Sequence, residues 1–160
     1  MWLAIRSIVW TIVIPGLVIL YIPWAFFGLG AAAVSGSDPV QLAGLMLTIG
    51  GTMFLVVCIW EFVAYGRGTL APVDPPKSLV VRGLYKYVRN PMYLSVLVVL
   101  LGEALLTRSL GQFEYTLGWF IWINLVVLFY EEPALYRAFG ASYQAYCASV
   151  SRWLPWPARS

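Results

Sequence analysis

The chain contains no histidine, two cysteines and few charged residues, with only 11% Asp, Glu, Lys and Arg among 160 residues. The absence of histidine excludes His-ligated haem, His-based metal sites and histidine as an acid–base catalyst. The two cysteines are Cys58, within an apolar run, and Cys147, in a polar stretch. Their placement matches neither a metal-ligand spacing nor a disulfide framework. We therefore expect two free thiols and no metal site.

Apolar residues dominate the rest of the composition, at 61% of the chain. Soluble globular domains carry about 25% charged residues, more than twice the share here. Because a chain in lipid must satisfy its backbone hydrogen bonds internally, this composition predicts an all-α integral membrane protein. The length predicts one membrane domain over residues 1–160, without a separate soluble module.

Four apolar runs predict four transmembrane helices, followed by short interfacial helices at 131–139 and 142–150. The first run is 27 residues long, and a signal peptide has an apolar core of about 7–15 residues, so we expect a retained span. The last two runs are short, since sixteen helical residues reach about 24 Å and the hydrocarbon core is about 30 Å thick. They either thin the bilayer or form a deep hairpin. The expected spans are residues 8–34, 40–64, 91–106 and 114–130.

The basic residues give the expected orientation. With four spans, nine of the ten lie on one face and Arg108 lies on the other. The positive-inside rule makes the face with nine basic residues cytoplasmic, and both termini with it. The nine residues are Arg6, Arg67, Lys77, Arg82, Lys86, Arg89, Arg137, Arg152 and Arg159.

Two polar motifs lie at the cytoplasmic ends of the expected third and fourth helices. Arg89-Asn90-Pro91 begins the third, and Glu131-Glu132 ends the fourth. If these helices pair antiparallel, the motifs meet in a pocket with tyrosine walls, and ionisable groups at membrane depth indicate a functional site. The alternative is structural: the acidic pair caps a new helix that begins at Pro133, and Arg89 anchors the chain at the interface.

Two other acidic residues allow structural interpretations. Glu103 lies one turn before the far end of the third run, where we expect it to pair with Arg108. Glu61 either faces the same cytoplasmic pocket or pairs with Arg67. The small residues around Gly50 favour close helix packing, which is their usual role in membrane helices.

The segment from Gly83 to Tyr93 follows the pattern G-x-Y-x-x-x-R-[HN]-P-x-Y, and a hydrophobic hairpin and Glu-Glu come after it. Further on, Phe139 to Tyr146 follows F-G-x-x-Y-x-x-Y, with Pro155 beyond. This ordered set, over about residues 66–155, resembles the membrane-embedded methyltransferases. These are the isoprenylcysteine carboxyl methyltransferases and the phospholipid N-methyltransferases.

The resemblance implies a helical bundle that binds S-adenosylmethionine at its cytoplasmic end, through residues 66–93 and 130–155. It also implies an enzyme that methylates a hydrophobic or amphipathic acceptor, either a phospholipid amine or an isoprenylcysteine-like carboxylate. A glycine motif in an earlier span of the phospholipid branch maps to Gly50, although Thr48 replaces its first glycine. The implied cofactor-binding residues are Tyr85, Arg89, Asn90, Tyr93, Glu131, Glu132 and Gly50.

Two departures favour the phospholipid branch. Asn90 stands where the isoprenylcysteine branch commonly has histidine, and residues 120–130 contain no arginine to hold a substrate carboxylate. The base that would take an amine proton is a tyrosine, a glutamate or the lipid phosphate. Two other functions stay open: a membrane scaffold that has the fold without the activity, and a reductase, since sterol reductases resemble this family in their C-terminal part.

Overall fold

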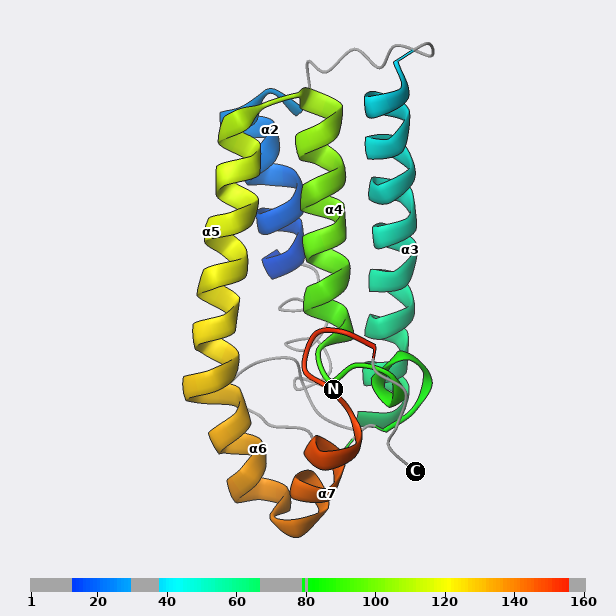
Figure 1. Ribbon diagram of the computed structural model, residues 1–160, viewed down its shortest axis with the longest axis vertical. Coiled ribbons are helices and arrows are strands. Elements are labelled where there is room, and N and C mark those ends of the chain that lie inside the picture. Colours follow the sequence, from blue (N-terminus) through cyan, green and yellow to red (C-terminus); the bar gives the residue numbers. More distant parts are fainter. Residues whose placement is uncertain (1–12, 30–37, 67–78, 80, 156–160) are drawn as a thin grey trace.

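Helices make up the architecture of the computed structural model, which describes residues 13–29, 38–66, 79 and 81–155. The expected all-α class is confirmed for these residues. In Figure 1, α4 lies between α3 and α5, and α2 lies beside α4 and α5. The main helices are α2 (Ile22–Phe27), α3 (Pro39–Gly66), α4 (Pro91–Thr107), α5 (Leu110–Val126), α6 (Glu132–Phe139) and α7 (Ala141–Ser149).

The first described helix is shorter than the expected span 8–34. It runs from Val13 to Phe27 and ends at Gly28, whose φ of 74° is left-handed. A π-helical turn, Leu17–Tyr21, lies between Pro15 and Pro23. A proline removes one helical hydrogen bond and clashes with the preceding turn, which a wider turn relieves. The parts of the expected span at 8–12 and 30–34 lie outside the described residues.

Helices α3 and α4 touch along a line of small residues. A Cβ atom built on Gly44 would lie 2.7 Å from the carbonyl oxygen of Gly102, and one on Gly102 would lie 2.5 Å from Oγ1 of Thr48. A Cβ on Gly51 would meet Val99 at 2.9 Å. These distances are too short for a real side chain, so the glycines are what allow the two backbones to approach.

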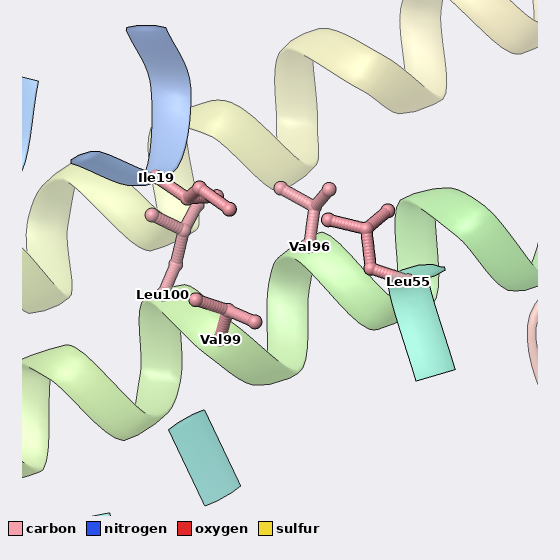
Figure 2. Packing of buried hydrophobic residues seen from close by; sticks show 5 residues of the cluster. All are labelled: Ile19, Leu55, Val96, Val99 and Leu100. Atoms are coloured by element: carbon pink, nitrogen blue, oxygen red, sulfur yellow. The ribbon is translucent and has the colours of Figure 1, made fainter. Parts of the chain in front are cut away.

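The core of the bundle is aliphatic. Figure 2 shows Ile19 and Leu55 meeting Val96, Val99 and Leu100 of α4, and none of the five side chains is more than 8% exposed. Because α4 presents these residues to helices on both sides, it fixes the spacing of the π-helical turn Leu17–Tyr21 and α3. Its N-terminal end at Pro91 is thereby placed beside the end of α3, where the polar motifs gather.

The Glu-Glu pair does not begin a separate helix, which argues against the alternative that it caps one. Helix α5 continues through a π-helical turn, Val127–Glu131, directly into α6. Glu131 has helical φ and ψ of −71° and −51°. Pro133 has no N–H to bond the turn before it, and the widened π turn accommodates the proline without breaking the helix. The acidic pair thus lies inside a continuous helix and caps nothing.

Two helices are long and apolar enough to cross a membrane: Pro39–Glu61, and the continuous helix Leu110–Phe139. Val13–Phe27 and Pro91–Thr107 are shorter apolar helices. The second and third expected spans coincide with α3 and α4. The fourth begins earlier than expected, at Leu110, because the Ser109 hydroxyl caps the helix by accepting from Gln112 N at 3.2 Å. Four membrane crossings stay a prediction.

The expected pairing of Glu103 with Arg108 is wrong. Arg108 ends α4 in the left-handed conformation, with φ 51°, and pairs with Asp38 at 2.5 Å. Glu103 instead points into the bundle, where it is 2% exposed and its carboxylate accepts from Nε2 of Gln112 at 3.1 Å. The left-handed residue turns the arginine toward the start of α3 and away from the α4–α5 contact.

Candidate functional site

The polar site begins where the chain returns from the segment after α3. A short 3₁₀ helix, Gly83–Lys86, leads to an extended stretch before α4. Glu61 near the end of α3 anchors it, because Leu84 N donates to its carboxylate at 3.4 Å. Gly83 has φ 49°, and any Cβ there would collide with the Glu61 carboxylate. Glu61 therefore faces this segment, while its alternative partner Arg67 lies outside the described residues.

Tyr85 is buried, with 9% of its surface exposed. Its carbonyl oxygen accepts from the hydroxyl of Tyr146 on α7 at 2.6 Å. Burial raises the pKa of both phenols above their ordinary value, so both are neutral at physiological pH. This contact fixes α7 against the 3₁₀ helix and explains the second tyrosine of the F-G-x-x-Y-x-x-Y pattern.

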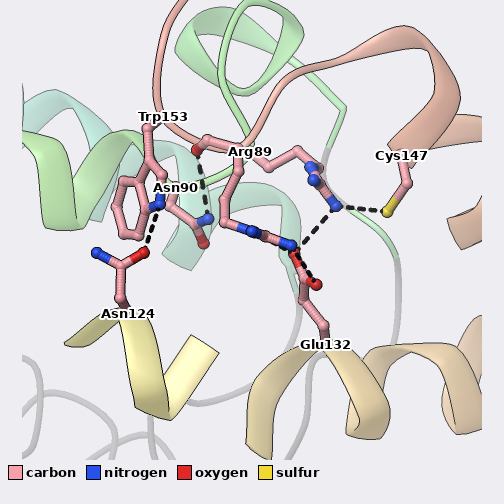
Figure 3. A network of polar contacts seen from close by, with 7 residues as sticks. Arg89, Asn90, Asn124, Glu132, Cys147 and Trp153 are labelled. Carbon is pink, nitrogen blue, oxygen red and sulfur yellow. Dashed lines mark hydrogen bonds and ion pairs between the residues drawn. The ribbon is translucent and has the colours of Figure 1, made fainter. Parts of the chain in front are cut away.

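Arg89 and Glu132 come together as the sequence predicts. The two side chains form an ion pair at 3.1 Å and are 13% and 19% exposed. The same Arg89 nitrogen donates to Sγ of Cys147 on α7 at 2.7 Å (Figure 3). The other expected contact is also made, because the hydroxyl of Tyr93 donates to the carboxylate of Glu131. Glu132 thus meets the Arg-Asn-Pro turn, and Glu131 meets the first turn of α4 that follows it.

Sequence reasoning missed the contribution of the segment after α7. Arg152 donates to both oxygens of Glu132, through Nε at 2.8 Å and a terminal nitrogen at 2.9 Å. Trp153 donates to the side chain of Asn124 at 2.8 Å (Figure 3). A signal existed for Asn124, since it is the one amide within the apolar run 120–130. The sequence contains no such signal for Arg152, because the positive-inside rule already explains a basic residue near the cytoplasmic end.

Asn90 reaches the same segment. Its side-chain nitrogen donates to the carbonyl oxygen of Arg152 at 3.4 Å. The backbone N–H of the neighbouring Arg89 donates to the carbonyl oxygen of Ser151 at 2.9 Å. Val88 and Ser151 also pair as an isolated parallel bridge. The Arg-Asn-Pro turn and the C-terminal segment therefore form one unit, although about sixty residues separate them in the chain.

Gly50 stands apart from the other six predicted residues. It lies midway along α3, eleven residues before Glu61, which is about 16 Å along a helix. No atom of another helix lies within 4 Å of a Cβ built there, in the part of the chain that the structure describes. The contacts that gather the other six do not include it, and its role as a cofactor ligand stays a prediction.

The site combines two carboxylates with two guanidinium groups at one end of the bundle. Their formal charges cancel, which removes much of the cost of burying any one of them. Two groups keep unused bonding capacity. The Nε–H of Arg89 is buried and has no partner among the described residues, and Tyr93 is the one donor found there for Glu131. A ligand that carries both an anion and a cation has complementary partners here.

The arrangement agrees with a comparison against known protein families. The profile of the phospholipid methyltransferase family matches residues 40–142 of this chain. The matched region contains α3, α4 and α5 and both halves of the polar motif. A search of curated proteins gives no match.

Proposed function

Because the chain belongs to the phospholipid methyltransferase family, we propose that it transfers a methyl group from S-adenosylmethionine to the amine of a membrane phospholipid. The observation that carries the proposal is the meeting of Arg89, Glu131 and Glu132 at one end of an apolar bundle. These groups suit a ligand with an amino-acid moiety, since carboxylates favour an ammonium and a guanidinium favours a carboxylate.

The residues present fit the cofactor. Glu131 and Glu132 would favour its ammonium group. The buried Nε–H of Arg89, which has no partner among the described residues, suits its carboxylate. Asn90 would hold the carboxylate or the ribose. Tyr85 and Tyr93 would line the same site, Tyr93 through its bond to Glu131. When bound, S-adenosylmethionine supplies a methyl group on a sulfonium centre that a nucleophile displaces in line.

The protein's main contribution to such a reaction is positioning, because an in-line displacement depends on holding two reactants in the correct orientation. An amine acceptor must also lose its proton to a base within reach. The raised pKa of Tyr85 keeps that phenol protonated, which makes it unsuitable as the base. Glu131 and the phosphate of the lipid are the candidates that fit best.

The proposed orientation follows from the described basic residues. Arg82, Lys86, Arg89, Arg137 and Arg152 belong to the segments at the site end, and Arg108 pairs with Asp38 at the opposite end. By the positive-inside rule, the site end faces the cytoplasm. From Leu110 to Glu131 the helix is about 33 Å long, enough to cross the hydrocarbon core. A lipid acceptor would reach the site from the bilayer between the helices.

An acceptor screen tests the proposal. Purified protein is incubated with isotope-labelled S-adenosylmethionine and either phosphatidylethanolamine vesicles or a prenylated cysteine analogue, and the labelled product is identified by mass. We expect label in the phospholipid amine. Label in the cysteine carboxyl would show that the acceptor is a prenylated cysteine and not a phospholipid. Binding of NADPH without methyl transfer would favour a reductase, and no binding or transfer would favour a scaffold.

A further inference from the structure

The C-terminal segment contributes to the site through its side chains as well as its backbone. Ser151 and Arg152 are held by the Arg-Asn-Pro turn through their carbonyl oxygens. Trp153 is held by Asn124 and packs edge to face on Phe120, with ring centroids 5.4 Å apart. Contacts on both sides of Arg152 therefore fix the backbone from which its side chain reaches Glu132.

Glu132 is shared unequally between its two arginines. Arg152 takes both carboxylate oxygens in a fork, whereas Arg89 contacts Oε1 alone, at 3.1 Å. A two-pronged contact is the preferred geometry of an arginine with a carboxylate, because it makes two parallel charge-assisted hydrogen bonds. Arg152 thus occupies the position that Arg89 would otherwise take.

This sharing leaves part of Arg89 unused. Its guanidinium is fixed at one terminal nitrogen by Glu132 and Cys147, and its buried Nε–H has no partner among the described residues. A buried donor without a partner is unfavourable, and such groups in native proteins usually mark a ligand or a functional role. Here the donor lies in the site proposed for an amino-acid carboxylate.

We propose that Arg152 is a positioning residue: by occupying Glu132 in a fork, it keeps the Nε–H of Arg89 available for the carboxylate of the bound cofactor. The inference rests on the proposed function of the site. It also gives the two residues of the acidic pair different roles. Glu131, which accepts from Tyr93, faces the cationic group of the ligand, and Glu132 holds the two arginines in place. Without Arg152, we expect Arg89 to rotate into the side-on fork, in which its Nε–H and one terminal N–H bond the two oxygens of Glu132, so that the free donor is lost.

Two ligands that differ in the amino-acid moiety test this role. S-adenosylhomocysteine carries the carboxylate, and 5′-methylthioadenosine has the same nucleoside without it. For Arg152→Ala we expect affinity for S-adenosylhomocysteine to fall about tenfold, as for loss of a charged hydrogen bond. Affinity for methylthioadenosine should stay within twofold of wild type. The affinity of Arg152→Lys for S-adenosylhomocysteine should lie between those of wild type and Arg152→Ala, because lysine keeps the charge but cannot form the fork.

Arg137, an exposed arginine in the last turn of α6, provides the matched control. Arg137→Ala removes the same charge and should bind both ligands as wild type does. Equal weakening of both ligands by Arg152→Ala would show general damage and overturn the inference. Wild-type affinity of Arg152→Ala for S-adenosylhomocysteine would also overturn it.

A double substitution tests whether Arg152 acts through Glu132. In a Glu132→Gln background the fork is already lost, so adding Arg152→Ala should weaken S-adenosylhomocysteine binding by less than twofold further. A full additional tenfold loss would contradict the proposed route. The two proposals fail in different ways: a wild-type protein that binds neither ligand overturns the proposed function, whereas wild-type binding that Arg152→Ala leaves unchanged overturns this inference alone.

Discussion

One end of the bundle contains a buried carboxylate and the other a partly buried one, and the two are stabilised by opposite means. Glu103 is 2% exposed and is met by a neutral amide, Nε2 of Gln112 at 3.1 Å. Glu132 has a side chain 19% exposed and is met by two arginines within 3.1 Å. The nearest basic residue in sequence to Glu103, Arg108, pairs with Asp38 instead.

The difference supports the proposal that the ligand binds at the Glu132 end. At the Glu103 end the helices are held by close backbone contact, as Gly44 and Gly102 show, and by Gln41 donating to the carbonyl oxygen of Leu106 at 3.0 Å. At the Glu132 end, four charged groups come from three separate segments, and the Nε–H of Arg89 has no partner in the part of the chain that the structure describes. Rigid packing at one end allows the other to hold costly charges in a fixed arrangement.

The largest effect is expected from Glu132→Gln. This change leaves Arg89 and Arg152 without their shared counter-charge. Breaking a fully buried ion pair from one side costs about 3–5 kcal/mol, and the partial exposure of these side chains lowers the cost below that range. We expect a loss of S-adenosylhomocysteine affinity of at least about 100-fold, measured by isothermal titration calorimetry, together with a lower melting temperature. Glu114→Gln, at an exposed position on α5, is the matched control. If both variants bind like wild type, the polar cluster is not the binding site.

The next largest effect is expected from Gly102→Ala, which should change stability and leave ligand binding unchanged. The new Cβ would lie 2.5 Å from Oγ1 of Thr48 and 2.6 Å from its backbone nitrogen. Overpacking of this kind costs about 1–3 kcal/mol. Gly118→Ala is the control: nothing lies near a Cβ there, and alanine favours a helix over glycine by up to about 1 kcal/mol. In thermal unfolding, Gly102→Ala should lower the melting temperature and Gly118→Ala should raise it slightly. Equal melting temperatures would contradict the close contact between α3 and α4.

Tyr93→Phe should give a moderate effect confined to the site end. It removes the hydroxyl that donates to Glu131 and keeps the ring, which packs edge to face on Trp119 with centroids 6.4 Å apart. A hydrogen bond to a charged group contributes about 1.5–3 kcal/mol. We expect about tenfold weaker S-adenosylhomocysteine binding in calorimetric titrations, because Glu131 loses the contact that orients it, together with a modestly lower melting temperature. A reversed result, stability lost and affinity kept, would make the contact structural.

Glu103→Gln should have the smallest effect. The amide keeps the shape of the side chain and can still accept from Gln112, so the change in stability should stay within about 1 kcal/mol. Binding of S-adenosylhomocysteine should be the same as in wild type, in the same titration. A loss comparable to that of Glu132→Gln would mean that the two carboxylates do not differ in the way the structure indicates.

Much of the site was predictable because its motif residues lie at helix ends. Arg89, Asn90 and Tyr93 surround Pro91, which begins α4, and the acidic pair follows the next apolar run. Antiparallel pairing of two neighbouring helices is enough to bring these groups together. Hydrophobic run lengths likewise predicted where α3 and α4 begin and end within a few residues.

The rest depended on tertiary contacts that no local pattern encodes. The fork from Arg152 to Glu132 requires the chain to reverse after α7, which the backbone bond from Arg89 to Ser151 fixes. The π turn before Pro133 was also missed, since a proline after two acidic residues has the local pattern of a helix start. The rotation of Arg108 toward Asp38 depended on a left-handed residue, a conformation rare for arginine.

Direct titration of the wild-type protein with S-adenosylhomocysteine, beside Glu132→Gln and Glu103→Gln, tests the central claim most closely. We expect saturable binding of S-adenosylhomocysteine to wild type and to Glu103→Gln, binding at least about 100-fold weaker to Glu132→Gln, and no binding of NADPH by any of them. Absence of S-adenosylhomocysteine binding by the wild-type protein, or equal loss in the two variants, would contradict the assignment of the site.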